Sequence, residues 1–86
     1  MRQPILYYAK DCPDTAPFVA ALAALNIEYQ AVEILENLAN FKQFLRLRDR
    51  HSAFDHAKEN GTIGIPALVW KDEIYLDVDE LAYLFK

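Results

Sequence analysis

The sequence is poor in the residues that cross-link small proteins or hold metals, because its 86 residues include one cysteine and two histidines. A single cysteine cannot form an internal disulfide, which excludes a secreted disulfide-bonded scaffold and favours the reducing cytoplasm as the compartment. His51 and His56 are five positions apart and distant in sequence from Cys12. Because the two histidines do not share a helix face, a zinc site is not expected.

Glycine, long apolar runs and positive net charge are also lacking. With only Gly61 and Gly64, the sequence has no glycine-rich phosphate loop, so nucleotide binding has no support. The longest apolar-looking run, residues 16–27, is about half of the ~20 residues that a membrane span needs, and it contains Pro17. The formal net charge is −4. We therefore expect neither a nucleic acid nor a membrane as a partner.

The residues that are present suffice for one hydrophobic core. Apolar residues make up 53% of the chain and charged residues 26%, a balance that excludes a disordered chain. A chain of this length folds without disulfides or metals. We expect a single domain over residues 1–86. A monomer is favoured, with an oligomer as the alternative.

Hydrophobic patterning predicts strands at residues 5–8, 27–33, 66–70 and 73–76. The first two strands flank a helix, and the last two form a hairpin about Lys71-Asp72. A βαβ unit pairs its strands in parallel through a right-handed crossover, whereas a hairpin pairs them antiparallel. The order βαβ-α-ββα therefore predicts an α/β fold with a mixed four-stranded sheet and helices on both faces.

Helix boundaries follow from capping residues and prolines. The first helix is expected to begin at Thr15 after an Asp14 N-cap, because Pro17 is then tolerated in the first turn. The second follows Asn37 or Asn40. The next helix spans about 52–59, with Ser52 and Asp55 as a capping box and Asn60-Gly61 at its end, and the last follows Asp77 or Asp79.

The three longer helices each show an apolar face at helical spacing. The residues expected to face inward are Phe18, Leu22 and Leu25, then Leu38, Phe41, Phe44, Leu45 and Leu47, and finally Leu81, Leu84 and Phe85. The second helix also has a basic side, formed by Lys42, Arg46, Arg48 and Arg50. We interpret this side as a solvated face.

Cys12 lies at the turn between the first strand and the first helix. The helix N-terminus offers unpaired N–H groups and about half a unit of positive charge, which favour the reactive thiolate. Lys10 also favours the thiolate, whereas Asp11 and Asp14 oppose it. These effects nearly cancel, so we expect a nucleophile of modest reactivity. The alternative is a small buried cysteine without chemical function.

A Cys-Pro-x-x turn after the first strand and an Ile-Pro pair opening the third resemble the thioredoxin fold at glutaredoxin size, over nearly the whole chain. Gly64–Leu68 is similar to the loop of that superfamily in which a cis-proline faces the catalytic cysteine. The resemblance implies a catalytic Cys12, an active-site turn and a thiol-binding edge. The turn would comprise Lys10, Pro13, Asp14 and Thr15, and the edge Ile65, Pro66, Val78 and Asp79.

The chain departs from the glutaredoxin pattern at two places. Thr15 stands where a resolving cysteine is common, which excludes a dithiol mechanism within one chain. We expect the Thr15 hydroxyl to donate a hydrogen bond to the Cys12 sulfur. Leu76 and Asp77 replace a glycine pair that precedes the last helix in the family, and they would crowd a bound glutathione.

Two functions remain. The first is a glutaredoxin-like thiol–disulfide oxidoreductase that uses Cys12 on mixed disulfides of small thiols or proteins, with glutathione or another small thiol as co-substrate. The alternative is a catalytically degenerate binding module that docks a peptide or thiol at the Ile65-Pro66 edge. An iron–sulfur cluster shared between subunits is disfavoured, because Pro13 and Asp14 depart from the Cys-Gly-Phe-Ser turn of cluster-binding relatives.

Overall fold

A central strand, β1 (Ile5–Tyr8), organises the sheet in the computed structural model, which describes residues 3–84. The strand order is β2-β1-β3-β4. β1 pairs in parallel with β2 (Gln30–Glu33) and antiparallel with β3 (Ala67–Trp70), and β3 pairs antiparallel with β4 (Glu73–Tyr75). The predicted mixed four-stranded sheet is confirmed.

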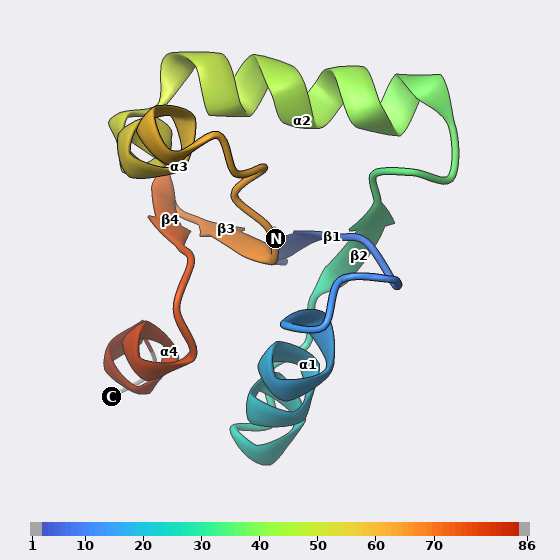
Figure 1. Cartoon of the computed structure of the whole chain (residues 1–86). Coiled ribbons are helices and arrows are strands. Elements are labelled where there is room, and N and C mark those ends of the chain that lie inside the picture. Colours follow the sequence, from blue (N-terminus) through green and yellow to red (C-terminus); the bar gives the residue numbers. More distant parts are fainter. Residues whose placement is uncertain (1–2, 85–86) are drawn as a thin grey trace.

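Helices cover both faces of this sheet (Figure 1). On one face lie α1 (Thr15–Ala24) and α4 (Val78–Leu84). On the other lies α2 (Leu38–Arg50), followed by the 3-10 helix η1 (Ser52–Phe54) and α3 (Asp55–Asn60). The arrangement confirms the predicted α/β class.

β1 is buried on both sides because its side chains alternate between two hydrophobic clusters. Leu6 packs with the α1 and α4 side chains Phe18, Leu22 and Leu81. Tyr7 points to the opposite face, where its ring lies 5.6 Å from that of Phe44, centroid to centroid. The second cluster comprises Tyr7, Ala9, Val32, Ile34, Phe44, Phe54, Ala67 and Ile74. Packing on both faces of the sheet therefore fixes the position at which the chain leaves β1.

The predicted start of the first helix is confirmed. For the second helix, the structure identifies which of the two predicted residues, Asn37 or Asn40, is the N-cap. α1 begins at Thr15, directly after Asp14, which places Pro17 at the third helical position. Asn37 caps α2, since its side chain accepts a hydrogen bond from the Asn40 N–H at 2.8 Å.

Two residues expected in the core are exposed. Leu25 follows the last residue of α1 and is 42% exposed. Leu38 is 65% exposed, because the first turn of α2 projects beyond the edge strand β2 (Figure 1). Phe41, Phe44 and Leu47 pack against the core from α2, as expected. Leu81 is buried as expected. The predicted burial of Leu84 concerns a side chain that is not described, and Phe85 lies outside the described residues.

Two further boundaries differ from the sequence prediction. β2 begins at Gln30 rather than at residue 27, because the four residues of β1 offer no partner to residues 27–29. The Ser52 capping box is wrong: the Nδ1 atom of His51 accepts the Ala53 N–H at 3.1 Å in its place. Gly61 ends α3 in the left-handed conformation, as predicted.

The last helix, α4, has a capping box, whereas the sequence pattern predicted one at Ser52. The Asp77 carboxylate accepts the Asp79 N–H at 3.3 Å. Glu80 reaches back to accept the N–H groups of Leu76 and Asp77, each at 3.1 Å. Asp77 is thus the cap, and Asp79 lies inside the first turn of α4.

Gly64 fixes how closely the loop before β3 approaches α3. Its φ of +92° lies in a region that side chains disfavour, and a Cβ atom there would lie 2.8 Å from the Cδ1 atom of Phe54. Phe54 is fully buried and cannot move aside easily. A residue without a side chain is therefore required immediately before Ile65 and Pro66.

We predict that Gly64→Ala lowers the free energy of unfolding by about 3 kcal/mol, because strained backbone and overpacking against Phe54 add up. Gly61→Ala is the matched control: its φ is also positive, at +70°, but no atom lies within 4 Å of the added Cβ. This control should cost about 1 kcal/mol. Urea denaturation measures both, and equal losses would contradict the packing role of Gly64.

Candidate functional site

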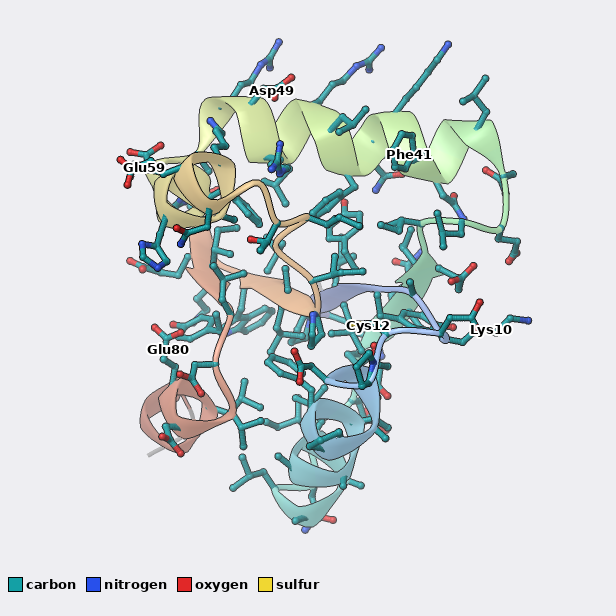
Figure 2. The ribbon with its side chains drawn as sticks, viewed as in Figure 1. Lys10, Cys12, Phe41, Asp49, Glu59 and Glu80 are labelled. Atoms are coloured by element: carbon teal, nitrogen blue, oxygen red, sulfur yellow. The ribbon has the colours of Figure 1, made fainter. Side chains whose placement is uncertain are left out.

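The turn between β1 and α1 is closed by its own hydrogen bonds. The Ala9 carbonyl accepts the Cys12 N–H at 3.0 Å, and the Cys12 carbonyl accepts the Thr15 N–H at 3.1 Å. Cys12 is half-buried and lies just outside the first turn of α1 (Figure 2). The cysteine is thus at the helix N-terminus, as predicted, while Pro13 beside it is exposed.

Thr15 does not donate to the Cys12 sulfur, contrary to the sequence expectation. Its hydroxyl donates to the Ala9 carbonyl at 2.9 Å, and the side chain is buried. A hydroxyl has a single proton to donate. Thr15 therefore ties the start of α1 to the end of β1, and its contribution is structural.

Of the charged side chains near Cys12, two aspartates line its pocket and one lysine points away from it. The Lys10 N–H donates to the Glu33 carboxylate at 3.1 Å, while the Lys10 side chain extends outward, away from Cys12 (Figure 2). Asp11 and Asp14 are exposed and line a pocket together with Cys12. Asp14 makes no capping hydrogen bond with its side chain, so its carboxylate is available to this pocket.

The register of β3 brings a second segment beside this turn. Tyr7 pairs with Ala67 in the antiparallel ladder, so Pro66 lies across from Tyr8, at the end of β1 that leads to Cys12. The Ile65–Pro66 peptide bond is cis, as predicted from the family resemblance. The structure thus brings the cysteine turn and the cis-proline loop to one end of the sheet.

Arg48 anchors the cis-proline loop to α2. Its Nε atom donates to the Ile63 carbonyl at 2.8 Å, and a terminal guanidinium nitrogen donates to the Thr62 carbonyl. For this reason, the predicted placement of Arg48 on a solvated basic face was wrong. The other three residues of that face, Lys42, Arg46 and Arg50, are exposed. Helical spacing alone could not distinguish Arg48, since the carbonyls that it binds belong to a loop distant in sequence.

Cys12 opens onto a hollow of about 490 Å³, which we call the thiol pocket. The turn and the loop form most of its wall: Ala9, Asp11, Cys12, Asp14, Leu35, Thr62, Ile63, Gly64 and Ile65. Two apolar side chains in it are largely exposed, Leu35 at 60% and Ile63 at 49%. Neither was identified from the sequence, because Leu35 and Ile63 lie outside the motifs recognised there.

A second hollow of about 320 Å³, the α4 pocket, lies on the other side of Ile65. It is lined by Asp14, Pro17, Phe18, Ile65, Pro66, Leu76, Asp77 and Val78. Asp14 and Ile65 line both pockets, so the two adjoin. Of the residues predicted at this edge, Val78 lines the pocket, whereas Asp79 is exposed in the first turn of α4 and is not part of its wall.

Acidic groups also surround Tyr75, at the end of β4 next to the α4 pocket. Burial raises the pKa of this phenol above its ordinary value of 10.0, and the carboxylates of Glu73 and Glu80 raise it further. The phenol therefore stays neutral at physiological pH.

Within residues 3–84, no group of three or more histidine, cysteine, aspartate or glutamate side chains is placed to hold a metal ion. Over the same residues, no helix has the length and apolar character required to cross a membrane.

Comparisons with known proteins identify a sequence relative and a structural one. No protein-family model matches the chain. An uncharacterized protein of Haemophilus influenzae is 51% identical over 86 residues, covering 99% of this chain and all of the relative. The crystal structure of a glutaredoxin from Archaeoglobus fulgidus superposes with a TM-score of 0.70.

That glutaredoxin is 18% identical, and the match covers all of this chain and 88% of the other, which establishes the fold. The predicted resemblance is thereby confirmed at the level of structure. The chain thus has the thioredoxin-like fold of that glutaredoxin, with a single-cysteine Cys-Pro-Asp-Thr turn, and it belongs to one family with the Haemophilus influenzae protein.

Proposed function

We propose that this protein is a single-cysteine thiol–disulfide oxidoreductase of the reducing cytoplasm, acting on mixed disulfides formed between small thiols, such as glutathione, and proteins. The observation that carries the proposal is the position of Cys12, at the N-terminus of α1 and in one pocket with Ile65. The helix terminus favours the thiolate form that attacks disulfides.

In the proposed reaction, the Cys12 thiolate attacks the small-thiol sulfur of the mixed disulfide. A disulfide forms between Cys12 and the small thiol, and the client leaves as a thiolate that takes a proton from water. A second small thiol then attacks the small-thiol sulfur of this adduct, which restores the Cys12 thiolate and yields a small-thiol disulfide. The second small thiol is the reductant: its sulfur is oxidised from thiol to disulfide, while the client sulfur is reduced from disulfide to thiol. The proton that the second thiol loses balances the one that the client takes up.

The two pockets suggest how such a mixed disulfide would be oriented. The backbone of Ile65, at the boundary between them, would pair with an extended substrate by strand addition. The α4 pocket would take the small thiol, since it adjoins the start of α4, where glutaredoxins hold glutathione. The client would then leave through the thiol pocket, where Cys12 lies.

One feature favours the second candidate function, a thioredoxin-fold binding module without turnover. Leu76 and Asp77 both line the α4 pocket, at the place where the family's glycine pair leaves space for glutathione. The Asp77 carboxylate is exposed and would repel an anionic tripeptide. Under this alternative, a peptide or thiol docks at Ile65 and Pro66 but Cys12 does not exchange.

Incubation with oxidised glutathione distinguishes the two functions. We expect a glutathione adduct on Cys12, observed by mass spectrometry, which reduced glutathione removes within minutes. The Cys12→Ser variant, an isosteric control, should form none. If wild-type protein forms no adduct, or one that reduced glutathione does not remove, the oxidoreductase proposal fails and the binding module is favoured.

The proposed chemistry does not use the Thr15 hydroxyl. We predict that Thr15→Val lowers the free energy of unfolding by about 1 kcal/mol, because the hydrogen bond to Ala9 is lost. The Ala9 carbonyl still accepts the Cys12 N–H, so the turn should persist. The pH dependence of Cys12 alkylation by iodoacetamide should therefore be unchanged. An altered profile in Thr15→Val but not in Thr15→Ser would show that the hydroxyl acts on the sulfur.

A further inference from the structure

The thiol pocket has an apolar wall that the proposed exchange reaction does not require. Leu35, between β2 and α2, and Ile63, before the cis-proline, expose large apolar side chains next to Cys12. Leu35 leaves 60% and Ile63 49% of its surface to solvent, and they belong to segments far apart in sequence. Large side chains gathered in a hollow, rather than scattered, mark a contact surface.

The rim of this apolar wall is acidic. Asp11 and Asp14 line the thiol pocket itself, and Asp77 lines the adjoining α4 pocket. A neighbouring hollow, which shares Asp11 and Leu35 with the thiol pocket, adds Glu33 and Glu36 together with Lys10. Substrates that approach Cys12 therefore encounter mainly carboxylates.

Within the described residues, neither Lys10 nor Arg48 forms an ion pair with Asp11 or Asp14. The Lys10 side chain extends away from Cys12 (Figure 2). Arg48 donates its hydrogen bonds to the carbonyls of Thr62 and Ile63 from the α2 side of the loop. The acidic rim therefore attracts cations and repels anions within about one Debye length.

This combination discriminates between the two halves of a mixed disulfide. Glutathione carries two carboxylates and one ammonium group, so it is anionic and repelled by the rim. A protein segment can instead bring an apolar side chain for the wall and a cationic side chain for the carboxylates. Two carboxylates line each pocket, so the exposed Leu35 and Ile63, which line only the thiol pocket, assign that pocket to the client. Asp11 and Asp14 then favour a cationic residue of the client there.

We propose that Cys12 acts preferentially on protein clients whose cysteine adjoins an apolar and a cationic residue, with Leu35 and Ile63 contacting the apolar side chain and Asp11 and Asp14 the cation. This inference rests on the proposed oxidoreductase function and specifies its substrate class. The four residues are specificity-determining, and the bond-making sulfur remains that of Cys12.

The test uses three short peptides, each with one cysteine carried as a mixed disulfide with glutathione. The flanking residues are leucine and lysine in the first, leucine and glutamate in the second, and serine and lysine in the third. Single-turnover consumption by the full-length protein is followed by mass spectrometry. Each rate is divided by the rate with 2-mercaptoethanol, which corrects for the peptide as a leaving group.

We expect the leucine–lysine peptide to react about tenfold faster than the leucine–glutamate peptide at low salt, and this ratio to shrink in high salt. It should react about fivefold faster than the serine–lysine peptide, because a leucine side chain is removed from water. Equal normalised rates for all three peptides would overturn the proposal.

Variants assign the two preferences to their residues. The double variant Asp11→Asn with Asp14→Asn should react equally fast with the leucine–lysine and leucine–glutamate peptides. The double variant Leu35→Ser with Ile63→Ser should react equally fast with the leucine–lysine and serine–lysine peptides. Glu28→Gln and Leu25→Ser are matched controls in a separate hollow that includes neither Cys12 nor Ile65, and they should change neither ratio. Ratios within one variant cancel any change in the intrinsic reactivity of Cys12. If the pocket variants behave like these controls, the assignment is wrong.

The outcomes also separate this proposal from the proposed function. Equal rates for all peptides, with an adduct on Cys12, would leave the oxidoreductase intact and remove only the client preference. Absence of reaction with every peptide would overturn both. A preference for the leucine–glutamate peptide would identify an anionic client and contradict the role given to the carboxylates.

Discussion

The pairing of β3 with β1 is the constraint on which the site depends. β1 is buried on both faces, so its end, and the turn that follows it, cannot shift without disturbing two hydrophobic clusters. The antiparallel register of Tyr7 with Ala67 then determines that Ile65 and Pro66 lie beside that turn. A slip by one residue would turn the side chains of β3 to the opposite faces. The buried sheet thus positions the thiol and its opposing loop together.

Contacts outside the sheet refine this arrangement from both sides. Thr15 closes the cysteine turn through the Ala9 carbonyl, and Arg48 fixes the loop through the Thr62 and Ile63 carbonyls. Gly64 allows the loop to lie against Phe54. The result is a half-buried thiol that opens onto an apolar, acid-rimmed pocket, and a smaller pocket beside α4 adjoins this one at Asp14 and Ile65. A shape of this kind suits a mixed disulfide, since its two halves differ in size and charge.

The sequence predicted those parts of the fold that depend on residues close together in the chain. The proline positions determined where α1 begins, the apolar runs located the sheet, and the family resemblance indicated the cis bond before Pro66. The sequence could not reveal contacts that depend on tertiary approach. Arg48 reads as one of four basic residues on a helix, and the Thr15 hydroxyl has two plausible acceptors. Leu35 and Ile63, which are distant in sequence, line the same pocket only after the chain has folded.

In the proposed function, a group bonded to Cys12 contacts the cis-proline loop and the start of α4. Amide NMR spectra of the isotope-labelled protein, recorded before and after glutathione is attached to Cys12, measure this directly. We expect shifted resonances at Ile65 and at Leu76–Val78, with Leu25 unchanged at the C-terminal end of α1. Shifts confined to residues 11–15 would contradict it, because the thiol would then face solvent without an opposing surface.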